Sequence, residues 1–331
     1  MLGFTGMTAR ARFEARSRAR FGVLALLVTG LAAAASLASD TGDVDTVGEA
    51  PLHFRSSFLD GEIVVQPGVF QPLEAEQTVL PMMADHADVF RGRSVLEIGT
   101  GSGIISLYAV QLGAARVVST DINPAAVATA RENAERLGFG ERMEVRRVPP
   151  ADMSAYSVLE PGERFDVIIS NPPYSLDLDA EKNDAVTDTG DLGFSIVRGL
   201  DERLTPDGMA LLLYASLFYH EVMLKFAEYE GFEVHSDPSS VLTPWEAGAL
   251  FNSYLARLLE REGVDRDAFR FDWRKEESLQ LRTSPPTESA FDRLRWLVTG
   301  ASGIERGPLF PDSKPGDYPG WLRIRRAHAQ P

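Results

Sequence analysis

Apolar runs of strand length recur through the middle of this chain and alternate with amphipathic stretches. The runs lie at 94–98, 116–120, 143–148, 165–169 and 209–214, and helical patterns follow the first two at 104–110 and 125–137. Strands that alternate with helices favour a mostly parallel sheet with helices on its faces. The pattern therefore predicts an α/β protein built on an open sheet.

The N-terminal 40 residues have a different pattern. Five arginines precede an apolar run at 21–38 that ends in small residues. This order is typical of a secretory signal, and roughly 19 uncharged residues could also just span a bilayer. An organellar transit segment, a start codon placed too far upstream and a buried helix remain as alternatives. We interpret residues 1–40 as a leader, signal or membrane anchor, and 41–60 as a polar linker that enters a hairpin near Gly61.

A glycine-rich turn follows the run at 94–98. Gly99, Gly101 and Gly103 form G-x-G-x-G behind Glu97, whereas the dinucleotide fingerprint is G-x-G-x-x-G. A carboxylate beside such a loop suits a cationic ligand better than a diphosphate. Because glycines after a strand let the backbone approach a ligand closely, the turn predicts a nucleotide-type site.

Two further acids fit the same site. Asp121 ends the next strand about 20 residues later, where an acid can hold both ribose hydroxyls of a nucleoside. Asp152 follows the run at 143–148 and could reach an adenine amino group, but a solvated acid in a turn after two prolines is an equal alternative. A nicotinamide-dependent oxidoreductase would use a glycine loop and Asp121 as well, so we keep it as an alternative function.

The segment that follows the run at 165–169 carries the acceptor chemistry. Asn171, Pro172, Pro173 and Tyr174 form N-P-P-Y. The Asn171 side-chain oxygen and the Pro172 carbonyl can both accept hydrogen bonds from one NH2 group, while Tyr174 offers a flat face. Two prolines fix φ and stiffen the turn. The motif predicts a clamp for a planar amide or base amine.

Together these motifs resemble the class I S-adenosylmethionine-dependent methyltransferases, specifically the small-domain N-methyltransferases that modify release-factor glutamine, ribosomal RNA guanine or adenine. The match runs from about Gly61 to Ser236 and includes an extended segment at 65–72 that in this group closes over the cofactor. The resemblance implies a Rossmann-like seven-stranded, mostly parallel sheet with strands six and seven antiparallel, and S-adenosylmethionine as the cofactor. It implies a catalytic clamp of Asn171, Pro172 and Tyr174 and cofactor contacts at Glu97, Gly99, Thr100, Gly101, Gly103, Asp121, Asp152 and Asn171. We expect no metal site, because the five histidines show no ligand spacing.

Composition and charge limit the partners. The chain has no cysteine, which excludes disulfides and thiolate zinc sites. The chain has 33 basic and 48 acidic residues, of which 5 basic and 2 acidic residues lie in 1–40. Residues 41–331 therefore carry 28 basic and 46 acidic side chains, a net charge of −18. Extended nucleic-acid binding is therefore disfavoured. The segment after the clamp contains one lysine, Lys182, and six acids: Asp177, Asp179, Glu181, Asp184, Asp188 and Asp191. An acidic loop there would also repel a nucleic acid, and a solvated loop without such a role is the alternative.

The C-terminal third departs from the glutamine methyltransferases. We expect a methyltransferase domain at 61–239 and an accessory helical insertion at 240–331, with helices from Pro244 and at 287–298 and a last strand at 321–325. Arg323, Arg325 and Arg326 would form a small basic patch at the edge of that strand. The N-terminal helical substrate domain of the glutamine enzymes is missing, which disfavours a release-factor substrate.

The sequence thus predicts an N-methyltransferase whose acceptor is a protein glutamine or a small molecule ahead of an RNA or DNA base. A non-catalytic S-adenosylmethionine-binding protein is a further alternative. The methyl donor favours a cytoplasmic or organellar-matrix location for the domain, whereas the apolar leader favours contact with a membrane or export.

Overall fold

The computed structural model describes residues 47–152, 154–173, 175–176, 187–188, 191–214, 217–237, 260–261, 263, 308–314 and 316–327. All of them belong to one compact unit, Thr46–Pro331. The expected leader, Tyr174, most of the acidic loop and the two helices expected after Thr243 lie outside the described residues. Among the residues that are described, no helix is long and apolar enough to cross a membrane.

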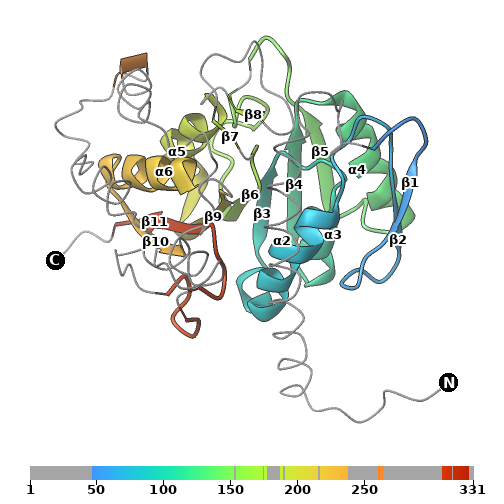
Figure 1. Ribbon diagram of the computed structural model, residues 1–331, viewed down its shortest axis with the longest axis horizontal. Helices are drawn as coiled ribbons and strands as arrows, with labels where there is room; N and C mark the ends of the chain where they lie inside the picture. Colours follow the sequence, from blue (N-terminus) through green and yellow to red (C-terminus); the bar gives the residue numbers. More distant parts are fainter. Residues whose placement is uncertain are drawn as a thin grey trace, which may run out of the picture. The chain divides into compact units, whose positions relative to one another are not determined.

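A seven-stranded sheet forms the centre of this unit, in the order β10-β11-β9-β6-β3-β4-β5 (Figure 1). The five strands from β9 to β5 pair in parallel, and β11 pairs antiparallel with both β9 and β10. The expected Rossmann-like sheet is confirmed. The seventh strand, β11, runs opposite to the other six strands of this sheet. The sixth strand, β10, is antiparallel to β11 and therefore runs in the same direction as β9. The bounds are β3 (Ser94–Ile98), β4 (Arg116–Asp121), β5 (Met143–Arg147), β6 (Phe165–Ser170), β9 (Leu204–Leu213), β10 (Phe232–Asp237) and β11 (Trp321–Arg326).

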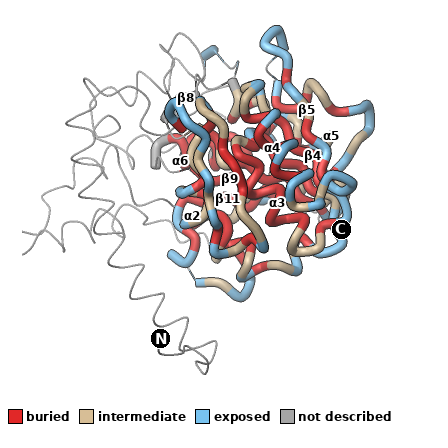
Figure 2. Tube along the Cα trace, turned by 90° about the vertical axis from the view of Figure 1, so that its right-hand side faces the viewer, coloured by how far each residue is buried: buried red, intermediate tan, exposed pale blue. Residues whose placement is uncertain are grey.

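Helices cover both faces of the sheet. In β3, Val95 packs into one hydrophobic cluster and its neighbour Leu96 into the other, since successive strand side chains point to opposite faces. The first cluster contains residues of α2 (Leu73–Asp85), α3 (Ile104–Gln111) and α4 (Pro124–Arg136), and the second contains α5 (Asp191–Arg203) and α6 (Leu217–Tyr229). Figure 2 shows the resulting buried backbone in red, with exposed loops around it. A 3-10 turn, η1 (Ala87–Val89), follows α2, and β7 (Ser175–Leu176) and β8 (Thr187–Asp188) form a short parallel pair.

The expected hairpin near Gly61 is formed by β1 (Leu52–Arg55) and β2 (Glu62–Val65), so the segment interpreted as a linker contains its first strand. Asn133 of α4 attaches the hairpin to the domain. Its side chain accepts from Val64 N at 2.9 Å and donates to Val64 O at 2.8 Å and to Ser102 O at 3.1 Å. One buried amide thereby joins β2 to the glycine-rich turn.

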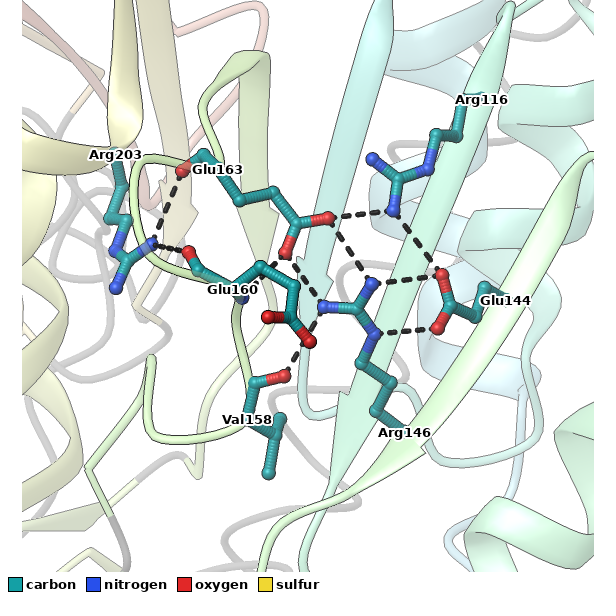
Figure 3. Close-up of polar contacts among 7 residues, drawn as sticks. All are labelled: Arg116, Glu144, Arg146, Val158, Glu160, Glu163 and Arg203. Carbon is teal, nitrogen blue, oxygen red and sulfur yellow. Dashed lines mark hydrogen bonds and ion pairs between the residues drawn. The ribbon is translucent and has the colours of Figure 1, made fainter.

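An ion-pair network connects β4 and β5 to the segment before β6 (Figure 3). Glu163 accepts from Arg116 at 2.6 Å and from Arg146 at 2.7 Å, and Arg146 also binds Glu144. Partial burial of Glu163 would raise its pKa, but the bonds from Arg146, Glu160 N and Arg116 lower the pKa to about 2. These two arginines are therefore occupied by protein carboxylates, as structural ion pairs.

The last strand is confirmed, but it lies inside the sheet between β9 and β10, where Arg323 is buried and donates to Leu309 O. Arg326 donates to Asp201 O at the end of α5. These arginines therefore do not lie on the edge strand that the sequence suggested, because β11 has a neighbour on each side. Asp237, the last residue of β10, pairs with Trp321, the first residue of β11, and Trp321 also pairs with Leu213 at the end of β9. The chain therefore leaves β10 and enters β11 at the end of the sheet where the parallel strands have their carboxyl ends.

Candidate functional site

The predicted site residues gather at the carboxyl ends of β3, β4 and β6, three neighbouring parallel strands. The glycine-rich turn leaves β3, Asp121 ends β4, and Asn171 follows β6. Open parallel sheets bind ligands at such a crevice, where the connections leave in opposite directions. The fold thus brings three of the sequence motifs to one edge.

Glycine is required in the turn for two different reasons. Gly99, Gly101 and Gly103 have φ of 78°, 52° and 86°, in the left-handed region that other residues rarely adopt. A Cβ at Gly103 would lie 3.1 Å from Ala130 of α4, so close helix packing also excludes a side chain there. A Cβ at Gly99 or Gly101 would meet no atom within 4 Å. These two glycines therefore expose backbone to open space, as a ligand cradle requires.

Glu97 lies beneath this turn in a buried polar network. Its side chain is 1% exposed and accepts from Thr100 Oγ1 at 2.7 Å, from Ser106 N at 3.2 Å and from Ser106 Oγ. Ser106 Oγ is in turn 2.6 Å from Ser119 Oγ. Burial raises the pKa of Glu97 to about 8, against the lowering effect of these hydrogen bonds and with a further increase from the charge of Asp121.

Thr100, expected among the cofactor contacts, uses its donors within the protein. Its hydroxyl donates to Glu97 and its backbone N–H to Thr120 O at 3.0 Å. Thr100 therefore shapes the turn and orients the carboxylate beneath it. Its direct contact with a cofactor stays a prediction.

Asp121 is fixed at the end of β4 by two backbone bonds. Its Oδ2 accepts from Gly101 N at 2.9 Å and its Oδ1 from Asn123 N at 2.8 Å. A carboxylate can accept about four hydrogen bonds, so Asp121 retains capacity for a ribose hydroxyl. Burial raises the pKa of Asp121, and the bonds from Gly101, Asn123 and Ile122 oppose that increase. The residue ties the glycine turn to β4 and is suitably placed for the expected ribose contact.

Asp152 lies on the surface in a turn. Its carboxylate accepts from Ser154 N at 3.2 Å, and its backbone carbonyl accepts from Ser157 Oγ at 3.0 Å. This is the local geometry expected of a turn acid. The contact with adenine stays a prediction.

The acceptor motif shows one unmatched acceptor. Asn171 Nδ2 donates to Glu74 Oε2 at 2.7 Å, while Asn171 Oδ1 is buried and has no hydrogen-bond partner among the residues that the structure describes. Pro172 beside it is buried as well. A buried carbonyl oxygen without a partner costs about 1–3 kcal/mol. A ligand with an N–H to donate would remove this cost.

Sequence reasoning missed two residues of the site. Glu74, in the first turn of α2, gave no local signal because acids are common at helix starts. Ile122 is 38% exposed immediately after Asp121, and it offers an apolar surface beside the carboxylate. No sequence signal was available for it, because single apolar residues are common on protein surfaces and only the structure shows its exposure.

Comparison with known proteins agrees with the motifs. Residues 75–172 match the family model of ribosomal protein L11 methyltransferase (PrmA). The chain is 39% identical over 82 residues to a ribosomal protein L11 methyltransferase of Pectobacterium carotovorum, covering 24% of each chain. It is 34% identical over 128 residues to a release factor glutamine methyltransferase of Chlorobaculum tepidum, covering 38% of this chain and 42% of that protein. The structure of a ribosomal protein L11 methylase from Lactobacillus delbrueckii aligns with 48% of this chain and 71% of its own at a TM-score of 0.38 and 22% identity.

The sheet topology and the glycine turn are those expected of a class I methyltransferase domain, and the sequence matches around them are to methyltransferases. The resemblance to the methyltransferases is thereby confirmed. The chain spans less than half the length of these two curated relatives, 24% and 42%.

The raised pKa of Glu97 predicts a pH-dependent stability. The folded protein binds a proton at Glu97 up to about pH 8, whereas an unfolded glutamate releases it near 4.5. The contribution of Glu97 to stability is therefore largest below pH 4.5 and is lost as the pH rises to 8, by on the order of 5 kcal/mol. Glu97→Gln should remove this slope. Urea unfolding of both proteins without cofactor at pH 5 and pH 8 tests it, and parallel pH profiles would contradict the assignment.

Proposed function

We propose that this protein transfers a methyl group from S-adenosylmethionine to the NH2 nitrogen of a planar acceptor, with a protein glutamine or small molecule ahead of a nucleic-acid base. The observation that carries the proposal is the buried Asn171 Oδ1, an acceptor without a partner at the carboxyl end of β6. An NH2 group supplies the donor that this oxygen lacks. The names of the relatives, which refer to a ribosomal protein and a release factor, support a protein acceptor.

The residues of the turn fit the proposed methyl donor. Gly99 and Gly101 leave open space, Asp121 can accept from a ribose diol, and Ile122 offers an apolar surface for an adenine ring. Glu97 lies beneath the turn with a pKa raised to about 8, and a cationic amino acid moiety bound at the turn would favour its ionised form. When bound, S-adenosylmethionine supplies an electrophilic methyl group on a sulfonium.

In this reaction the chain acts by positioning. Asn171 Oδ1 and the Pro172 carbonyl hold the two hydrogens of the acceptor NH2, which turns the nitrogen lone pair away from the clamp and toward the methyl group. The proton leaves after transfer, so the clamp needs no general base. Negative charge of −18 on residues 41–331 disfavours a partner bound along its phosphate backbone.

A labelling experiment tests the proposal. The protein is incubated with S-adenosylmethionine labelled in its methyl group and a cell extract, which is then separated into protein, nucleic acid and small molecules. We expect label in protein or small molecules. Strong acid should release labelled methylamine from an N-methylamide, whereas an N-methylated amine keeps its label. Calorimetric binding of S-adenosylmethionine without label in any fraction would indicate a non-catalytic binding protein.

A further inference from the structure

Glu74 lies on the opposite side of Asn171 from the free oxygen. It is in the first turn of α2, 97 residues before Asn171, and its Oε2 accepts from Asn171 Nδ2 at 2.7 Å. The carboxylate is an acceptor only, whereas an amide has a donor end and an acceptor end. Only the NH2 end of Asn171 can therefore face Glu74.

The remaining end of the amide is fixed as a consequence. With its NH2 directed at Glu74, Asn171 must present Oδ1 on its other side, and this oxygen is buried with no partner in the part of the chain that the structure describes. The terminal torsion of asparagine is broad and nearly twofold, so the protein backbone alone does not select this orientation. A charge-assisted bond to Glu74 does.

The first turn of α2 is itself held in place. Glu76, two residues after Glu74, accepts from Ser57 N at 2.7 Å, Ser57 Oγ at 2.6 Å and Ser56 Oγ at 2.5 Å. These bonds fix the start of the helix to the loop of the β1-β2 hairpin. The carboxylate of Glu74 is thereby presented from a rigid support rather than from a loop.

We propose that Glu74 is a positioning residue that sets the orientation of Asn171 and so restricts the site to acceptors with an N–H to donate. The inference rests on the proposed function. The hydrogen bond fixes which atom of Asn171 meets the substrate, and its negative partner polarises the amide so that Oδ1 is a stronger acceptor. A substrate that offers only an oxygen acceptor, such as a carboxylate, would be repelled.

A double-mutant cycle tests this role, with label incorporation into the protein fraction of a cell extract as the measured rate. Glu74→Ala should lower the rate about tenfold, and Asn171→Ala about a hundredfold. The double variant should be no slower than Asn171→Ala, because Glu74 acts through that residue. Glu74→Gln should retain part of the rate, since its amide oxygen can still accept from Asn171. The calorimetric affinity for S-adenosylmethionine should stay within about twofold of the parent in all variants.

The controls distinguish the positioning role of Glu74 from the proposed methyl-transfer function. Glu141→Ala removes an exposed carboxylate in the turn before β5 and should leave the rate unchanged. A double variant about tenfold slower than Asn171→Ala, or a Glu74→Ala protein with the parental rate, would overturn the role of Glu74 while leaving the proposed function intact. A parental rate in Asn171→Ala would instead overturn the proposed function. Thermal unfolding of each variant excludes loss of the fold as the cause.

Discussion

Asn171→Ala is expected to lower methyl transfer by about a hundredfold while leaving the affinity for S-adenosylmethionine nearly intact. The substitution removes the buried Oδ1 that would accept from the substrate NH2, and it leaves the Glu74 carboxylate without the donor it has at 2.7 Å. We expect binding of the cofactor to depend on the glycine turn after β3 and on Asp121 of β4, which belong to other strands. Measured on the same preparation, the rate of methyl transfer to the labelled acceptor should therefore fall, while the dissociation constant from a calorimetric titration should stay nearly the same.

Asn171→Asp is the matched control for this prediction. Aspartate keeps the shape of asparagine and an acceptor at the Oδ1 position, but it has no N–H to give to Glu74, and two carboxylates would then face each other. We expect it to lose activity as well, although it retains acceptor oxygens. An Asn171→Ala protein that transfers methyl groups at the parental rate would show that the motif is only a turn.

The strands and the glycine turn were predictable because their signals are local. Val95, Val117 and Val167 belong to apolar runs whose lengths suit buried strands, and the glycines that follow the first run need left-handed φ angles. The direction of β10 could also have been deduced. It follows β9 through α6, and a strand-helix-strand connection in one sheet is normally a parallel crossover.

The contact that orients the acceptor motif could not be predicted in this way. Glu74 and Asn171 are 97 residues apart, and an acid in the first helical turn is explained by the helix dipole alone. The buried position of Arg323 was equally hidden, because alternation with Leu322 and Ile324 is also the pattern of an edge strand with one exposed face. Both depend on tertiary packing that the sequence pattern does not record.

Asp121→Ala is expected to weaken S-adenosylmethionine binding by about ten- to a hundredfold, or roughly 1.5–3 kcal/mol, because charge-assisted hydrogen bonds to the ribose are lost. The same carboxylate accepts from Gly101 N and Asn123 N, so part of the loss reflects a loosened glycine turn. Asp121→Asn separates the two contributions, since its single oxygen can keep one backbone bond while the charge is removed.

The measurement is a calorimetric titration at a temperature where thermal unfolding shows both variants to be folded. Burial raises the pKa of Asp121, so the parent should bind more weakly as the pH falls and the carboxylate is protonated. Asp121→Asn should lack that pH dependence, because it has no proton to gain. A folded Asp121→Ala protein with the parental dissociation constant would exclude Asp121 from the cofactor site and leave its two backbone bonds as its role.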